Sequence, residues 1–382
     1  INAGSGGQTV TQGGGAAVED SAPVITGSST ENTVTINAEK DQTASVTLSG
    51  ADIDVSGKGK AAVSTTGEGN VSIELDGENT LKSATNHAGL EKNNGGSLTI
   101  ADEDKNGKLT AEGGIYGAGI GGGYEGEGSN IAITGGEVEA TGGIGGAGIG
   151  GGKNGAGSSI AITGGEVKAT GGKYGAGVGG GLSGNGNHIT ITGGEVKATG
   201  GLNGAGIGGG LWGKGKDITI SGDAQLKVQG GVGDYFDGPG AGIGDGGSRP
   251  KESTGGNPIP GTEVEPDTSG LTTNGSIEYY APGADMEKDK PEKTTVGTLP
   301  PQEKPVEPIE PAEPEQPEAE RGMDAPLYRV TDRDGRNIAY TAEQKGGVLT
   351  VTADEDLAIL TGRLSGIRTL KAQGVEKIVF VT

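Results

Sequence analysis

A glycine-rich string recurs along the middle of the chain at a fixed distance. The string Gly-Ala-Gly-Ile/Val-Gly-Gly-Gly begins at Gly117, Gly146, Gly175 and Gly204, in steps of 29 residues, and an altered copy begins at Gly240. A second string, Ile-x-Ile-Thr-Gly-Gly-Glu-Val, lies between these copies and begins at residues 131, 160 and 189. Self-similarity at one fixed period is typical of a solenoid, in which each repeat forms one structural unit that stacks on its neighbours.

Each repeat contains three short apolar segments separated by turn residues. In the repeat that begins at residue 160 they are Ile160/Ile162, Val167/Ala169 and Ala176/Val178. A spacing of two residues is the period of a β-strand, and the intervening Thr-Gly-Gly and longer Gly-rich stretches are turn sequences. Strands this short cannot bury an apolar face alone, but stacked coils pair each strand with its counterparts above and below. The sequence therefore predicts an all-β, three-sided parallel β-helix.

The same segments can be followed back towards the N-terminus with less regular turns. The first segments begin at Val46, Val71, Leu98, Ile131, Ile160, Ile189 and Ile218, and the early second segments contain Ile53, Leu81 and Leu109. This pattern predicts about seven coils, whose strands stack in that order.

Composition changes on both sides of the repeats divide the chain into five parts. We expect a flexible or capping segment over residues 1–30, the parallel β-helix over 31–246 and an irregular C-terminal cap over 247–283. Residues 284–322 are rich in Pro and Glu, which favours an extended linker. Residues 323–382 have ordinary composition and predict a small β-rich module, which the chain end cuts short. We therefore expect a monomeric piece of a larger multidomain protein.

Composition excludes several classes of protein. The chain of 382 residues has 84 Gly, no Cys and only two His, His87 and His188, so Cys-based metal sites and disulfide scaffolds are excluded. The net charge of −22 opposes binding to nucleic acid. No apolar run approaches the ~20 residues that cross a bilayer, so we expect no membrane insertion. The lack of Cys suits an extracellular location.

Aromatic residues flank the glycine-rich strings. Tyr116 and Tyr174 directly precede a copy, Tyr124 directly follows one, Trp212 comes two residues after another, and Tyr235 lies with Phe236 in an insertion before the fifth copy. Stacked coils would place these side chains along one edge. Exposed aromatic rings offer flat faces on which sugar rings stack, so the first five are the candidate carbohydrate-binding residues. The alternative is that the rings shield the Gly-rich corner from water.

Oxygen-bearing side chains alternate between residues 102 and 107. Asp102, Asp104 and Asn106 match the first half of a calcium-binding loop, and Gly107 provides a turn, but Gly113 stands where such a loop carries its bidentate Glu. These three residues are the candidate calcium ligands. The alternative is a solvated turn between two strands.

A second acidic pattern follows the repeat itself. Glu137, Glu166 and Glu195 recur in register, and Lys168 and Lys197 lie two residues further along, on the same side of their strands. The resulting ladder of Glu and Lys would keep the solenoid soluble. Calcium bridging between these Glu residues and an acidic sugar is the alternative.

No catalytic motif is present. The sequence contains no Gly-x-Ser-x-Gly, His-Glu-x-x-His or P-loop, and its Gly-x-Gly-x-x-Gly matches lie in turns of the repeat. Polysaccharide lyases also use parallel β-helices, but they need a basic residue beside clustered acids, and residues 31–246 contain no Arg. We therefore expect that this part of the protein is not an enzyme.

The residues that begin Val71-Ser-Ile-Glu-Leu-Asp-Gly, together with His87-Ala-Gly-Leu90 and the two repeated strings, resemble clostridial-type surface proteins with a carbohydrate-binding parallel β-helix domain. The resemblance covers residues 30–246. It implies a right-handed parallel β-helix on the cell surface or in a secreted protein, and its type member binds polygalacturonate and carries calcium. We thus expect non-catalytic binding of polysaccharide or another glycan by many weak sites. A structural stalk or adhesin that presents another domain is the alternative, and a lyase is the remote one.

Overall fold

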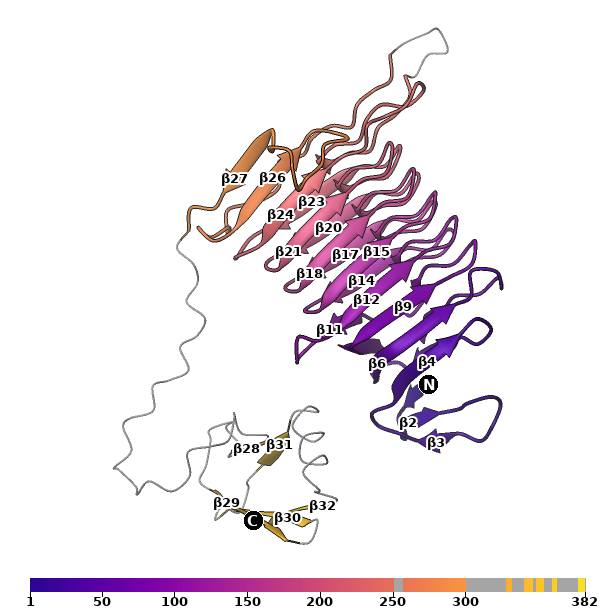
Figure 1. The fold of residues 1–382 in the computed structure, drawn as a ribbon, viewed down its shortest axis with the longest axis vertical. Coiled ribbons are helices and arrows are strands. Elements are labelled where there is room, and N and C mark those ends of the chain that lie inside the picture. The colour runs from indigo at the N-terminus through magenta and orange to yellow at the C-terminus, as the bar shows by residue number, and fades with distance from the viewer. Residues whose placement is uncertain are drawn as a thin grey trace. The chain divides into compact units, whose positions relative to one another are not determined.

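The computed structural model describes residues 1–250 and 257–299, together with five strands beyond residue 327. The chain divides into two compact units, Ile1–Lys304 and Pro305–Thr382. Every regular element among the described residues is a β-strand, and none is a helix. The first unit is a stack of parallel strands, drawn from indigo to orange in Figure 1.

Three rows of strands run along the first unit. The first row contains β4 (Val24–Ser29), β6 (Thr43–Asp54), β8 (Asn70–Asp76), β11 (Leu98–Ala101), β14 (Gly128–Ile133), β17 (Gly157–Ile162), β20 (Gly186–Ile191) and β23 (Gly215–Ile220). The second row shares the long strand β6 and continues with β9 (Glu78–Lys82), β12 (Lys108–Glu112), β15 (Glu137–Thr141), β18 (Glu166–Thr170), β21 (Glu195–Thr199), β24 (Gln225–Gln229) and β26 (Ser276–Tyr280).

The third row lies in a separate sheet and has the shortest strands. It contains β1 (Asn2–Gly4), β5 (Val34–Ala38), β7 (Val63–Gly67), β10 (Leu90–Lys92), β13 (Ile120–Gly121), β16 (Ile149–Gly150), β19 (Val178–Gly179), β22 (Ile207–Gly208) and β25 (Ile243–Gly244). All neighbours within this row pair in parallel. The apolar residues of the three rows meet in one buried core.

The stack has about nine turns, so the prediction of about seven coils is wrong. The additional strands lie at both ends: β1, β4 and β5 precede the predicted coils, and β26 adds a second-row strand after them. The strand β1 pairs in parallel with β5, and β4 pairs in parallel with β6, so residues 1–30 contribute strands to the solenoid. The count from the sequence begins with the segment at Val46, so it leaves these earlier strands out. The parallel all-β solenoid itself is confirmed, and the right-handed coiling of the chain that the resemblance implies stays a prediction.

The stacking order of the regular repeats is confirmed residue by residue. Ile131 pairs with Ile160, and Ile160 pairs with Ile189. In the early turns the register differs by two residues. Val71 lies beside Ala44 rather than Val46, and Leu109 lies beside Asn79 rather than Leu81. A shift of two keeps every side chain on its face of the strand, so alternation alone does not reveal it.

Asn79 is buried in the core column because its amide satisfies the backbone around it. Its Oδ1 accepts a hydrogen bond from the Ala51 N–H at 3.0 Å. Its Nδ2 donates to the carbonyl oxygens of Asp76, Gly77 and Lys108, at 3.1–3.2 Å. A buried amide with its polar atoms paired is tolerated in an apolar core.

Glycine is required where the turns approach one another. A Cβ built on Gly172 would lie 1.6 Å from the carbonyl oxygen of Gly143 on the preceding turn. A second requirement is conformational. Gly121 and its equivalents in the next four third-row strands have φ between 132° and 137°, which side chains with a Cβ rarely adopt. These two demands explain the Gly content of the repeat.

Both ends of the stack are covered by antiparallel strands. At the N-terminal end, β2 (Gly7–Val10) and β3 (Val18–Glu19) fold back on β1. At the C-terminal end, β27 (Lys293–Val296) pairs antiparallel with β26. Such strands protect the open edge of a sheet from pairing with another chain. Residues 284–299, which the sequence assigns to a linker, thus belong to this end, and the rest of the predicted linker lies outside the described residues.

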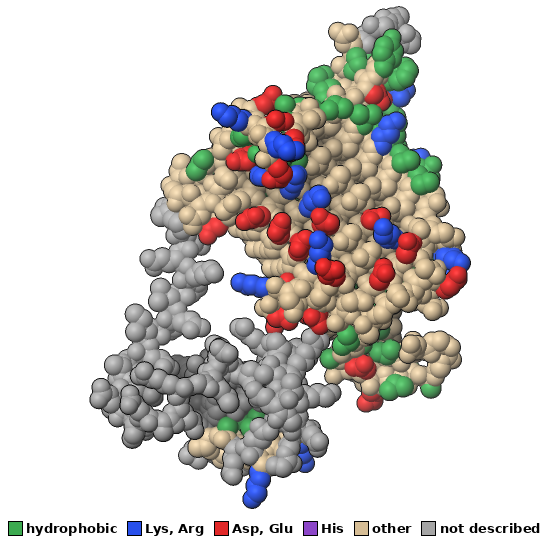
Figure 2. All heavy atoms as spheres, in the orientation of Figure 1, with side chains coloured by type: hydrophobic (Ala, Val, Ile, Leu, Met, Phe, Trp, Pro, Cys, Tyr) green, Lys and Arg blue, Asp and Glu red, His purple; other side chains and the backbone are tan. Residues whose placement is uncertain are grey.

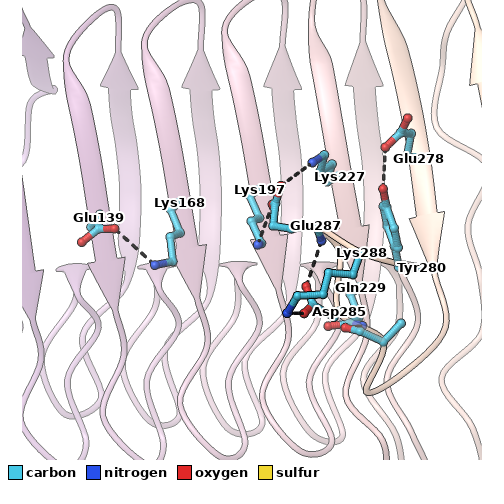
Figure 3. A network of polar contacts seen from close by, with 11 residues as sticks. Glu139, Lys168, Lys197, Lys227, Gln229, Glu278, Tyr280, Asp285, Glu287 and Lys288 are labelled. Atoms are coloured by element: carbon cyan, nitrogen blue, oxygen red, sulfur yellow. Dashed lines mark hydrogen bonds and ion pairs between the residues drawn. The ribbon is translucent and has the colours of Figure 1, made fainter. Parts of the chain in front are cut away.

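A strap after β26 holds the last turns of the second row together (Figure 3). The carboxylate of Glu287 contacts Lys197 and Lys227 on neighbouring strands, each at 3.0 Å. The side chain of Gln229 donates to the carbonyl oxygens of Ala281 and Ala284 at 2.7 and 2.9 Å. Figure 2 shows acidic and basic side chains in rows over this face.

The second unit has two small sheets. β28 (Tyr328–Thr331) pairs antiparallel with β31 (Ile359–Gly362). β30 (Val348–Ala353) lies between the antiparallel β29 (Tyr340–Lys345) and the parallel β32 (Lys377–Val381). All five of these strands lie between residues 328 and 381. A search of the described residues for a helix long and apolar enough to span a membrane finds none.

Candidate functional site

The turns that follow the second-row and third-row strands interlock along one edge of the solenoid. The Lys153 N–H donates to the Tyr116 carbonyl at 2.8 Å, and the Leu211 N–H donates to the Tyr174 carbonyl at 2.8 Å. Both bonds join a turn after a third-row strand to a turn of the preceding coil. We use the name aromatic ridge for the side chains that the turns between Ile115 and Phe236 present along this edge, together with Arg249. In Figure 2, hydrophobic side chains gather over these turns on the right-hand side of the solenoid.

The repeat places the ridge side chains in three columns. One column contains Tyr116, Gly145, Tyr174 and Asn203. The second contains Tyr124, Lys153, Leu182 and Leu211, and the third contains Glu125, Asn154, Ser183 and Trp212. Because strands stack ~4.8 Å apart, neighbours in a column are about that far apart.

The N-terminal part of the ridge holds a pair of tyrosines with a lysine. The ring centres of Tyr116 and Tyr124 are 5.6 Å apart, with an angle of 52° between the rings. The Lys153 Nζ lies 4.6 Å from the centre of the Tyr116 ring and 5.7 Å from that of Tyr124. A cation at this distance is attracted by the negative face of an aromatic ring. Gly145 makes room for the lysine stem, since a Cβ there would lie 2.9 Å from Lys153 Cβ.

The C-terminal part of the ridge holds a concavity of about 450 Å³. It is lined by Lys173, Tyr174, Leu182, Leu211, Trp212, Asp234, Tyr235, Phe236, Asp237 and Arg249. Trp212, Tyr235 and Phe236 are 47%, 88% and 63% exposed, so three large aromatic side chains stand together at the surface of this concavity. A few polar groups beside exposed rings are the usual composition of a small-molecule site.

Two cations stand against the rings of this concavity. The Lys173 Nζ lies 4.7 Å from the centre of the Tyr174 ring. The Arg249 guanidinium lies 5.5 Å from Trp212 and 5.8 Å from Phe236. Its Nε also donates to both carboxylate oxygens of Asp237 at 3.2 Å. These contacts orient the rings and leave charged donors beside them.

Tyr235 and Phe236 lie in a short insertion, and hydrogen bonds hold this insertion in place. The carboxylate of Asp234 accepts hydrogen bonds from the N–H groups of Phe236 and Asp237, which holds the pKa of Asp234 below its usual value. The buried Nδ2 of Asn203 donates to the carbonyl oxygen of Asp237 at 2.9 Å. The Asp237 Oδ1 in turn accepts from Trp212 Nε1 at 3.0 Å.

Trp212 has a left-handed backbone conformation, with φ of 66°. The equivalent residues Glu125, Asn154 and Ser183 have φ of 59°, 65° and 64°, so the turn imposes this conformation on each coil. A bulky residue in this region is uncommon and costs about 1–2 kcal/mol. The left-handed conformation is thus a property of the turn, and at Trp212 it carries an indole that is 47% exposed.

The predicted calcium ligands lie in one turn, but their oxygens largely serve the turn itself. Asp102 accepts from the N–H groups of Asn106 and Gly107 at 3.2 and 3.1 Å. The Asn106 Nδ2 donates to Asp104 at 3.0 Å. Among the described residues, the acidic group that the structure brings together is Glu74, Asp102 and Asp104, with oxygens within 4.8 Å of one another.

Glu74 was missed by the sequence reasoning because it belongs to the preceding turn. It stands beside Ala101 in the pairing of β8 with β11, so a correct register would have found it. Burial, followed by the charges of Glu103, Asp102 and Asp104, raises the pKa of Glu74. Burial, followed by a hydrogen bond with Asp102, raises the pKa of Asp104. The carboxylates therefore repel one another.

The predicted ladder of Glu and Lys forms, with a different pairing. Glu137, Glu166 and Glu195 stand side by side in the second row. Lys168 contacts Glu139 on the neighbouring coil at 3.2 Å (Figure 3), and Lys108 contacts Glu137. Ion pairs across coils thus involve Glu137 and Glu139, whose lysine partners stand at other register positions than those predicted.

Taken together, the stacked rows define a parallel β-solenoid built from repeats. Four segments of the chain, residues 105–124, 131–153, 160–182 and 189–211, match the sequence model of the family described as "Beta helix repeat". The protein therefore carries β-helix repeats over these four segments, which include Tyr116, Tyr124 and Tyr174 and end just before Trp212. No curated protein and no solved structure matches the chain.

The structure brings the five predicted aromatic residues to one edge in two groups. Tyr116 and Tyr124 form the first, and Tyr174, Trp212 and Tyr235 line the second. The prediction missed the cations. Lys153 lies in the second column and Lys173 directly precedes Tyr174, so both could have been found from the repeat, whereas Arg249 follows the last repeat and carries no periodic signal.

Proposed function

We propose that this protein is a non-catalytic carbohydrate-binding β-helix that holds a repeating polysaccharide on its aromatic ridge. The observation that carries the proposal is the concavity in which Tyr174, Trp212, Tyr235 and Phe236 meet charged donors. Sugar rings present apolar C–H faces and polar edges, which suit aromatic faces beside hydrogen-bond donors. Binding would be weak at each site and would gain strength from several sites on one polymer.

The proposal extends to the setting of the protein. A secreted or cell-surface bacterial protein meets polysaccharides directly, and the absence of Cys and the net charge of −22 are compatible with that setting. The partner is a polysaccharide or glycan, and nucleic acid and membrane lipid are not partners. Within a larger multidomain protein the solenoid would act as a monomer.

Retention on immobilised polysaccharides tests this function. The wild-type protein is expected to be retained on at least one of cellulose, xylan, mannan, mucin and polygalacturonate in affinity gels. Tyr174→Ala with Trp212→Ala should abolish retention, whereas Val24→Ala, an exposed apolar residue at the other end of the solenoid, should not. Unchanged circular dichroism would show that the variants are folded. Equal retention of wild-type protein and the double variant would refute the proposal.

The same gels distinguish the alternatives. A structural stalk is favoured by the covered ends of the solenoid and its continuous backbone hydrogen bonds between coils. It predicts that no polysaccharide is retained. A lyase predicts unsaturated sugar products. Repeating the gels with EDTA and with added calcium shows whether retention needs calcium, and Asp102→Asn with Asp104→Asn shows whether a cation held by Glu74, Asp102 and Asp104 is responsible.

A further inference from the structure

We propose, building on the function proposed above, that the bound polysaccharide is a linear chain that runs parallel to the solenoid axis. One chain would contact the Tyr116/Tyr124 pair and the Trp212 concavity at the same time. The alternative orientation, across the axis, would place a ligand on one coil and leave the tyrosine pair without a role in binding the same chain.

The register of the repeat supports this orientation of the polysaccharide. Tyr116 and Tyr174 occupy the same position two coils apart, because Ile120 pairs with Ile149 and Ile149 pairs with Val178. Two steps of ~4.8 Å separate the backbone positions by about 10 Å. A pyranose ring in a linear polymer advances by about one such step. The rings are therefore spaced as alternate sugar units of one extended chain would be.

The column that holds Tyr116 and Tyr174 carries only a glycine between the two rings. Gly145 stands between the two tyrosines of the column and has no side chain, and the Lys153 stem lies over it. Leu182, one coil beyond Lys153, lines the concavity itself. No side chain of the column that holds Tyr116, Gly145 and Tyr174 therefore separates Tyr116 from Tyr174.

Hydrogen-bond donors accompany the rings along the same line. Lys153 lies against Tyr116, Lys173 against Tyr174, and Arg249 against Trp212. Each of these three rings thus has a cationic donor beside it, which comes from the next coil for Tyr116, from the same coil for Tyr174 and from the segment after the repeats for Trp212. A polymer along the axis meets this combination repeatedly, and each additional contact raises the effective concentration for the next.

The chain contains a single tryptophan, so the fluorescence of Trp212 reports on the concavity alone. The probes are the disaccharide to the octasaccharide, prepared by partial hydrolysis of whichever polymer retains the wild-type protein. An axial chain predicts that affinity measured at Trp212 rises about tenfold or more from the shortest to the longest probe. In the variant Tyr116→Ala with Tyr124→Ala, the long probe should lose most of this gain.

Two controls keep the result interpretable. Tyr116→Leu with Tyr124→Leu retains apolar packing but removes both rings, and should lose the gain in the same way. Val24→Ala should keep the full gain with length. Equal affinity for all probe lengths, or a gain that survives the loss of both tyrosines, would overturn the axial orientation while leaving carbohydrate binding in place. Retention on no polysaccharide, as expected if the ridge docks a protein, would overturn both.

Discussion

Replacing Gly172 by Ala is the sharpest test of how the coils are stacked. The new Cβ would lie 1.6 Å from the Gly143 carbonyl oxygen, and real contacts of this kind are not shorter than 3.0 Å. Gly172 is not in a left-handed conformation, so the effect is steric and not conformational. The neighbouring turn must therefore move away from its partner, and backbone offers no flexible end that could yield.

The expected loss follows from the bonds that hold these two turns. The Gly172 N–H donates to Gly146 at 3.0 Å, and the Tyr174 N–H donates to Ile144 at 2.9 Å. Losing both, at about 1 kcal/mol each, and adding the strain of displaced backbone gives about 3–5 kcal/mol. Thermal unfolding followed by far-ultraviolet circular dichroism should show a midpoint lowered by about 5–10 °C.

Gly57→Ala is the matched control, because a Cβ there meets no atom within 4 Å and its φ is not left-handed. It should be neutral or stabilise by up to about 1 kcal/mol, because alanine restricts the unfolded chain. If Gly172→Ala changes stability no more than Gly57→Ala does, the close stacking of turns is refuted.

Three further predictions concern charge. Burial lowers the pKa of Lys92 to about 8, so the free energy of unfolding should rise with pH between about 8 and 10.5, the pKa of lysine in the unfolded chain. Lys92→Met should remove that rise, as measured by urea unfolding at pH 7 and pH 10. The raised pKa of Asp104 means that its carboxylate opposes folding above that pKa, so Asp104→Asn should raise the thermal midpoint slightly at pH 7 and have no effect at pH 3. Lys197, followed by Lys227, lowers the pKa of Glu287, so the stabilisation that Glu287 contributes is present above pH 4.5 and is lost as the pH falls through the lowered value. Glu287→Gln should therefore lower the thermal midpoint at pH 7, and the decrease should be smaller in high salt.

Strand alternation was predictable from the sequence, while the count of turns was not. The pattern Ile160/Ile162 recurs because both side chains enter one core, and any sequence with that core must repeat it. The first turns bury Ala3, Ile36 and Ala38 in the same way, but their turn sequences differ from the later repeats. Without a repeated string, a short strand such as β1 has no signal that distinguishes it from a loop.

The candidate site also has one part that the periodicity of the sequence predicts and one part that it does not. The aromatic residues sit at fixed offsets from a periodic string, so stacking was enough to predict that they share an edge. The loop that carries Tyr235 is an insertion into the period, and its position depends on Asn203 and Asp237, whose hydrogen bonds are long-range and irregular. Arg249 reaches Trp212 from the segment after the last repeat. Contacts of this kind follow from the folded chain and not from periodicity.

The fold separates what fixes the backbone from what meets a ligand. Glycines at equivalent positions of successive coils allow the carbonyl oxygen of one coil to lie close to the Cα of the next, and a side chain at these positions disrupts the stack. The turn position of Trp212 is different, because Glu125, Asn154 and Ser183 adopt the same backbone conformation with unrelated side chains. The coil therefore determines where a ridge side chain stands and leaves its chemistry free. A solenoid of this kind can change its binding surface one coil at a time without changing its core, which is why the ridge rather than the core carries the function proposed for this protein.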